Sequence, residues 1–130
     1  NFLDYLLWKN NKNKYSDFEF EFRNSVEHWY PQNPSDGSFD PWEDKDTFGN
    51  LCIISRSVNS KFSNLSPESK MKSYGKMVAK GSLKLRLMGE IIQQNSNDDW
   101  INNYCEKHEK KMISILEDAC KKCENDNLLL

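Results

Sequence analysis

Three short segments between residues 26 and 64 decide the fold that this sequence predicts. They read Val-Glu-His-Trp-Tyr-Pro-Gln (26–32), Phe-Gly-Asn-Leu-Cys-Ile-Ile-Ser (48–55) and Ser-Val-Asn-Ser-Lys-Phe-Ser-Asn (57–64). The first ends a short extended run at a proline, the second contains an apolar strand, and the third has the pattern of a short helix. Folded together, they would surround one divalent metal ion with an acidic residue, the adjacent histidine and an asparagine from the helix.

The length and composition are those of a single soluble domain. A chain of 130 residues can bury roughly two-thirds of its unfolded surface in one core. Its hydrophobic fraction of 37% and charged fraction of 29% are ordinary for globular proteins. No apolar run approaches the roughly 18 residues that span a bilayer, and no signal-peptide pattern opens the chain. We therefore expect a cytoplasmic location and no membrane partner.

The hydrophobic spacing outlines an α+β domain. It predicts strands over 17–22 and 51–54, a loop over 31–48, and helices over 2–8, 57–62, 67–80, 82–94 and 98–124. These elements divide the single domain into an N-terminal helix and strand that pack on the core (1–22), a ββα core (23–80) and C-terminal helices (81–130). Since the chain opens at Asn1 directly into a helix pattern, we expect it to be excised from a larger protein, with a missing N-terminal domain as a partner. The sequence leaves the oligomeric state open.

Charge is distributed unevenly along the chain. The net charge is −2, yet residues 1–55 hold 5 Lys or Arg against 10 Asp or Glu, residues 56–90 hold 8 against 2, and residues 91–130 hold 5 against 8. The overall value argues against a general nucleic-acid coat. The basic block follows the segments that decide the fold, and it predicts either an anion-binding surface or a solvated helix face.

The four cysteines invite a zinc hypothesis, because Cys105-x-x-His108 and Cys120-x-x-Cys123 have ligand-like spacing. Helix geometry opposes it. If 98–124 is one helix, Cys105 and Cys120 lie about 22 Å apart at 1.5 Å per residue, too far to share an ion. We expect these side chains to be core or partly buried thiols unless the helix breaks.

His28 is the better candidate of the two histidines for catalysis. His108 lies on the apolar stripe of the last predicted helix, where a buried role is expected. His28 instead lies where a strand ends and Pro31 turns the chain away, a place where side chains meet solvent and substrate. Hydrolysis of a phosphodiester needs an activated water and stabilisation of the charge on phosphate, which one imidazole and one Mg²⁺-like ion can supply.

A family resemblance supports this interpretation. Glu27-His28-x-x-Pro31-Gln32, Phe48-Gly49-Asn50-Leu51, and Asn59 with Lys61 and Asn64 resemble the HNH (His-Me finger) nucleases, most closely the C-terminal domain of GmrSD-type restriction enzymes. The resemblance covers about residues 23–76. It implies a ββα-metal core surrounded by helices and an endonuclease that cuts DNA with one Mg²⁺ or Mn²⁺ ion, in restriction or antiviral defence.

The resemblance also implies roles for individual residues. His28 would be the general base, Glu27 the acidic metal ligand, and Asn59 the helix residue that completes the metal site. Asn50 would orient the His28 ring, so that its unprotonated nitrogen faces the water. Taken singly, Glu27 could be a solvated strand residue, Asn50 could cap the turn at Gly49, and Asn59 could be a helix N-cap.

The basic block would then hold phosphates along the duplex, independent of base sequence. The residues expected to do so are Arg56, Lys61, Asn64, Lys70, Lys72 and Lys76. Two alternatives remain at this point. The chain could be a catalytically inactive nucleic-acid-binding module with the same fold, or an interaction domain whose final helix binds a partner.

Overall fold

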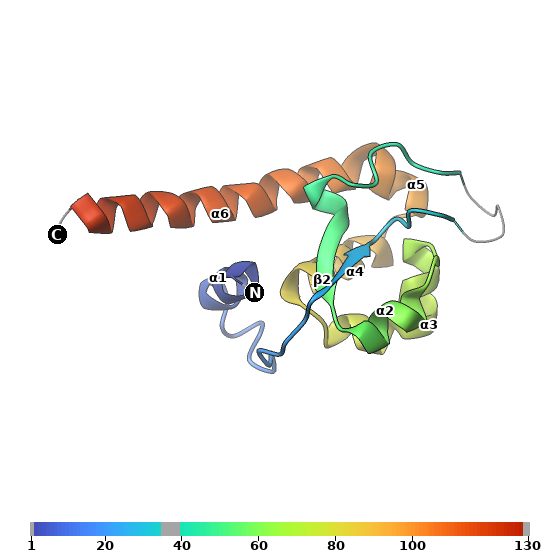
Figure 1. Cartoon of the computed structure of the whole chain (residues 1–130), viewed down its shortest axis with the longest axis horizontal. Coiled ribbons are helices and arrows are strands. Elements are labelled where there is room, and N and C mark those ends of the chain that lie inside the picture. Colours follow the sequence, from blue (N-terminus) through green and yellow to red (C-terminus); the bar gives the residue numbers. More distant parts are fainter. Residues whose placement is uncertain (1, 35–39, 129–130) are drawn as a thin grey trace.

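The computed structural model describes residues 2–34 and 40–128, and Figure 1 shows their arrangement. The elements in chain order are α1 (Phe2–Asn10), β1 (Ser25–His28), the 3₁₀ turn η2 (Phe48–Asn50), β2 (Leu51–Ile54), α2 (Arg56–Phe62), α3 (Pro67–Ala79), α4 (Leu83–Gln93), α5 (Asn97–Asp99), the π-helical turn η3 (Trp100–Tyr104) and α6 (Cys105–Leu128). Part of the predicted loop, 35–39, lies outside the described residues. No helix among those described is long and apolar enough to cross a membrane.

The α+β class is confirmed. β1 and β2 pair antiparallel, with Ser25 opposite Ile54 and His28 opposite Leu51, and α2 follows directly in ββα order. Ser55 begins α2 by accepting a hydrogen bond from the Val58 backbone N–H on its side chain, which satisfies one of the first free amides of the helix. This short unit carries the candidate site.

The prediction of a strand over 17–22 is wrong. Described residues 18–24 form no regular element, and Phe20 and Phe22 are 57% and 81% exposed. Alternation predicts a strand only where a partner edge supplies backbone hydrogen bonds, and the sheet formed by the described residues has two strands only. The aromatic rings pack locally instead: the Phe20 ring centroid lies 4.8 Å from that of Phe18 and 5.7 Å from that of Trp8.

The N-terminal helix packs on the C-terminal helices. α1 contacts α4 and α6, and its buried Asp4 accepts a hydrogen bond of 2.8 Å from the backbone N–H of Leu83 at the start of α4. A buried carboxylate at a helix N-terminus satisfies a free amide and complements the helix dipole. The division of the chain at 22/23 and 80/81 stays a prediction.

The core brings the site against the C-terminal helices. One cluster of buried residues joins β2 and the two residues after β1 with α2, α3, α4, η3 and the start of α6: Trp29, Tyr30, Cys52, Ile54, Phe62, Val78, Leu85, Met88, Ile92, Trp100 and Cys105. The turn η2 approaches α6 so closely that a Cβ at Gly49 would lie 2.6 Å from the Cys105 carbonyl oxygen. Any larger residue at position 49 would therefore push the turn before β2 away from α6.

The last helix does not form the zinc site that the cysteine spacing suggested. α6 runs unbroken from Cys105 to Leu128; Cys105 is buried, whereas Cys120 and Cys123 are exposed. Within the described part of the chain, no three His, Cys, Asp or Glu side chains are grouped to hold a metal. His108 is 4% exposed and packs near the Trp100 ring, as its place on an apolar stripe predicts.

Replacing His108 should make the fold less sensitive to acid. Burial lowers the pKa of His108 from 6.5 to about 3, and Lys84 and Lys111 add repulsion. Between these values the unfolded chain binds a proton that the folded chain does not, so the free energy of unfolding falls as the pH falls. At pH 5 this loss is about 2 kcal/mol, because one pKa unit corresponds to about 1.4 kcal/mol.

We therefore expect His108→Leu to lose about 2 kcal/mol less stability than the unmutated protein between pH 7 and pH 5. Urea unfolding at the two pH values measures this difference. An equal loss in both proteins would contradict the account of His108.

Candidate functional site

A polar cavity of about 170 Å³ lies where β1 ends beside α2. It is lined by Val26, Glu27, His28, Pro31, Gln32, Asn33, Asn59, Ser63 and Asn64. Four of the residues that the sequence singled out thus share one cavity, although about 30 residues separate the Glu27-His28 pair from Asn59. Glu27 and His28 come from β1, Asn59 from α2, and Asn64 from the segment that follows α2.

The contacts of His28 assign its tautomer. The ring Nε2 lies 2.7 Å from Asp46 Oδ1, and the Gln32 amide nitrogen lies 3.2 Å from the ring Nδ1 and 3.1 Å from Nε2. Hydrogen bonds from Lys45 and His28 lower the pKa of the Asp46 carboxyl, so it is ionised and can only accept. His28 Nε2 therefore carries the proton in the neutral ring, and Nδ1 is the basic nitrogen.

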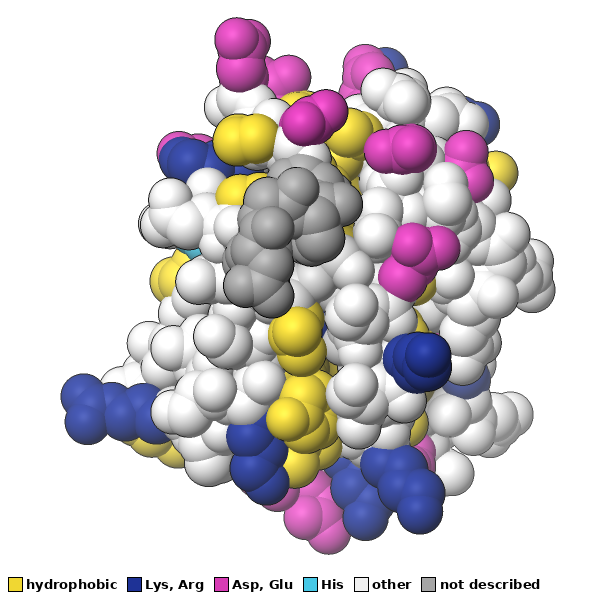
Figure 2. Space-filling model, turned by 90° about the vertical axis from the view of Figure 1, so that its right-hand side faces the viewer, with side chains coloured by type: hydrophobic (Ala, Val, Ile, Leu, Met, Phe, Trp, Pro, Cys, Tyr) yellow, Lys and Arg dark blue, Asp and Glu magenta, His cyan; other side chains and the backbone are white. Residues whose placement is uncertain are grey.

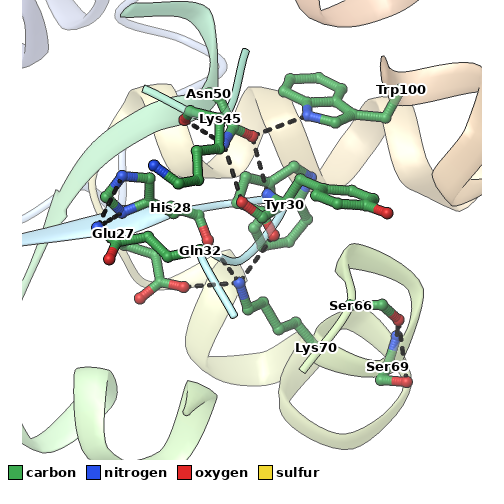
Figure 3. Close-up of polar contacts among 11 residues, drawn as sticks. Glu27, His28, Tyr30, Gln32, Lys45, Asn50, Ser66, Ser69, Lys70 and Trp100 are labelled. Carbon is green, nitrogen blue, oxygen red and sulfur yellow. Dashed lines mark hydrogen bonds and ion pairs between the residues drawn. The ribbon is translucent and has the colours of Figure 1, made fainter. Parts of the chain in front are cut away.

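Lys70 holds the end of β1 from the side opposite the solvent. Its Nζ lies 2.6 Å from Glu27 Oε1 and 2.8 Å from each of the carbonyl oxygens of His28 and Trp29, as Figure 3 shows. Burial lowers the pKa of Lys70 while Glu27 opposes this effect, and burial raises the pKa of Glu27 while Lys70 opposes it. Three acceptors match the three N–H groups of an ammonium, so we assign Lys70 the charged form.

The prediction that Lys70 binds DNA phosphate is therefore wrong. Its side chain is 0% exposed, and all three of its donors are used within the protein. In the sequence, Lys70 and Lys72 look equivalent, but in α3 the Lys70 side chain is buried and the Lys72 side chain is exposed. Lys70 instead fixes the carboxylate of Glu27 and the backbone of the two residues after it.

Asn50 also has a different role from the one expected. Its side chain is 0% exposed and makes four hydrogen bonds: Oδ1 accepts from Tyr30 N and Trp100 Nε1, and Nδ2 donates to the carbonyl oxygens of Tyr30 and Lys45. None of these reaches the His28 ring. Figure 3 shows Asn50 between the turn after β1 and Trp100. Asn50 therefore acts on His28 indirectly. It fixes the backbone of Tyr30, two residues after His28, and the carbonyl group of Lys45, which precedes the ring's partner Asp46.

The other predicted DNA-binding cations lie at the surface. Arg56 and Lys61 on α2, and Lys72 on α3, are exposed, and none of them lines the cavity. Figure 2 shows one face on which Lys and Arg side chains gather mostly in the lower part, where Figure 1 places α2 and α3, and Asp and Glu in the upper part. A contact of Arg56, Lys61, Lys72 or Asn64 with DNA stays a prediction.

The cavity offers a divalent ion few but suitable ligands. Glu27 Oε1 is bound to Lys70, whereas Oε2 accepts no hydrogen bond from a described residue. Asn59 adds an amide oxygen on the same cavity. Mg²⁺ commonly takes one or two protein oxygens and keeps water and phosphate for the rest of its shell. The residues present therefore fit a hydrated hard cation and would not form a closed structural metal site.

Sequence reasoning missed the partners of the two central residues. Asp46, which orients the His28 ring, lies in an acidic loop with no spacing that marks it, and Lys70 is 43 residues from Glu27. Gln32 belongs to the quoted motif, but it carried no assigned role.

Comparison with known proteins agrees with this geometry. The family model described as "GmrSD restriction endonucleases, C-terminal domain" matches residues 1–115, which is most of the chain and includes every residue of the cavity. No curated protein and no solved structure gave a significant match. The chain thus belongs to the family of C-terminal domains of GmrSD restriction endonucleases.

Proposed function

We propose that this domain is a metal-dependent endonuclease of the HNH type that hydrolyses phosphodiester bonds in DNA. His28 is the general base, and Glu27 and Asn59 hold one Mg²⁺ or Mn²⁺ ion. The observation that carries the proposal is the single cavity that Glu27, His28 and Asn59 share. The restriction endonuclease family of the chain makes DNA the substrate of choice.

The chemistry follows from the tautomer of His28. Nδ1 accepts a proton from the attacking water, while Asp46 on Nε2 stabilises the imidazolium that forms. Gln32 must release its contact with Nδ1 when water binds there. Lys70 binds one oxygen of the Glu27 carboxylate and so holds this group at the cavity. A bound divalent ion would supply charge stabilisation at the phosphate and the leaving oxygen.

We place this activity within a larger cytoplasmic restriction or antiviral defence protein. The described residues include no base-reading element that we can identify, and the exposed cations would attract the DNA backbone regardless of sequence. An N-terminal domain of the same polypeptide would then select the DNA.

Incubation with supercoiled plasmid tests the function. We expect nicked or linear product with Mg²⁺ or Mn²⁺, no product with excess chelator, and recovery when the metal is restored. Binding to duplex DNA without cleavage under any divalent ion would favour the inactive nucleic-acid-binding module. Absence of both binding and cleavage would contradict both.

A further inference from the structure

A second cavity, of about 300 Å³, lies between the chain before β1, the end of β2 and the last turns of α3. Three of its lining residues are basic, Arg23, Lys76 and Lys80, and one is acidic, Glu21. Lys76 and Lys80 are exposed, and neither forms an ion pair within the described part of the chain. A concave site with this excess of positive charge favours an anionic ligand.

Arg23 is the buried cation of this cavity. Its residue is 6% exposed, and its Nη2 donates to the Lys80 carbonyl oxygen at 3.4 Å and lies 3.6 Å from Glu21 Oε2. Its Nη1 is buried and has no hydrogen-bond partner among the described residues. A buried donor without an acceptor is unfavourable, and a guanidinium matches the oxygens of a phosphate in pairs. Arg23 therefore adds a positive charge to the lining of the cavity and keeps one donor without an acceptor among the described residues.

The position of the cavity relates it to the His28 site. Ile54 lines it and pairs with Ser25, so it lies at the opposite end of the two-stranded sheet from His28. The five residues from Arg23 to His28 can span at most roughly 16 Å, so the two cavities lie within a few nucleotides of each other on a bound strand. Val58 of α2 lines this cavity, and its neighbour Asn59 lines the other. The two cavities therefore lie on neighbouring sides of α2, close enough to contact one nucleic-acid backbone.

We propose that this second cavity binds a phosphodiester group of the DNA backbone a few nucleotides from the bond that is cut. Arg23, Lys76 and Lys80 contribute the positive charge. We call this cavity the phosphate anchor, and its role rests on the nuclease function proposed above. It would fix the position of the strand relative to the His28 site and carry no base specificity.

The anchor can be tested by DNA binding without cleavage. Fluorescence anisotropy of a labelled 20-base-pair duplex, in chelator and over a range of salt concentrations, is measured for the full chain and for the double variant Lys76→Gln, Lys80→Gln. Both side chains are exposed, so the fold should be retained. Loss of one phosphate contact should lower the slope of log K against log salt by about 0.9 and weaken binding about eightfold at 0.1 M salt.

Two further variants sharpen the result. The double variant Lys121→Gln, Lys122→Gln removes the same charge from the exposed end of α6 and should change affinity far less. Arg23→Gln should weaken binding at least as much as the Lys76, Lys80 variant, with its melting temperature measured to check the fold.

An unchanged slope in the Lys76, Lys80 variant, an equal loss in the α6 control, or no DNA binding by the unmutated chain would overturn the anchor. The anchor would also be overturned if inorganic phosphate raised the melting temperature of the unmutated chain but not of the Lys76, Lys80 variant, while both bound DNA equally well. The ligand of the cavity would then be free phosphate. Failure of plasmid cleavage alone bears on the proposed nuclease and leaves this binding result standing.

Discussion

Replacing His28 with alanine should slow DNA cleavage by about 10²- to 10⁴-fold, the usual contribution of a general base. In the proposed mechanism the ring is the proton acceptor, because Asp46 accepts a hydrogen bond from Nε2–H and Nδ1 is left as the base. Alanine removes this nitrogen but leaves Glu27 and Asn59 in place, so metal and DNA binding should persist. Single-turnover cleavage of plasmid, with excess enzyme and saturating Mg²⁺, measures the rate.

The control for this variant is Asn33→Ala, because Asn33 lines the same cavity, is exposed and has no role in the proposed chemistry. The fold should survive His28→Ala, since the partner of the ring, Asp46, is 66% exposed and such pairs contribute about 0–1 kcal/mol. Cleavage by His28→Ala at the rate of Asn33→Ala would remove His28 from the mechanism.

Replacing Lys70 with methionine should lower the free energy of unfolding by about 3–5 kcal/mol, the cost of breaking a buried ion pair by removing one partner. The change leaves the Glu27 carboxylate without its counter-charge in a buried position. It also leaves the carbonyl oxygens of His28 and Trp29 without their donor. Urea unfolding at pH 7 measures the effect.

Lys72→Met is the matched control, because Lys72 lies two residues away on the same helix and is exposed. It should change stability by no more than about 0.5 kcal/mol. Adding Glu27→Gln to Lys70→Met should recover part of the loss, since the buried charge is then gone. If Lys70→Met and Lys72→Met lowered the free energy of unfolding by the same small amount, Lys70 would not be the cation that holds the site.

The sequence allowed the ββα order to be predicted because each element carries a local signal. Pro31 ends the extended run at His28, Leu51–Ile54 is a short apolar run, and Ser55 can begin a helix. The motif spacing also placed Glu27, His28 and Asn59 together. These features depend on residues that are neighbours in the chain or on a pattern already seen in relatives.

The remaining features depend on contacts between distant residues, which no local pattern encodes. In the sequence, Lys70 resembles the other surface cations, and only the packing of α3 brings it to Glu27 of β1. Asn50 reads as a turn residue until Trp100, 50 residues later, supplies its fourth hydrogen bond. The alternation at Phe18, Phe20 and Phe22 failed for the same reason, because a strand exists only where another strand offers it a partner.

The most direct measurement is the position of a bound Mn²⁺ ion, found by anomalous diffraction from crystals of the protein grown with Mn²⁺. The account predicts one ion in the cavity between Glu27 and Asn59, beside His28, which disappears in Glu27→Ala. An ion bound elsewhere, or an empty cavity at a Mn²⁺ concentration that supports cleavage, would contradict the assignment of this cavity as the metal-dependent active site.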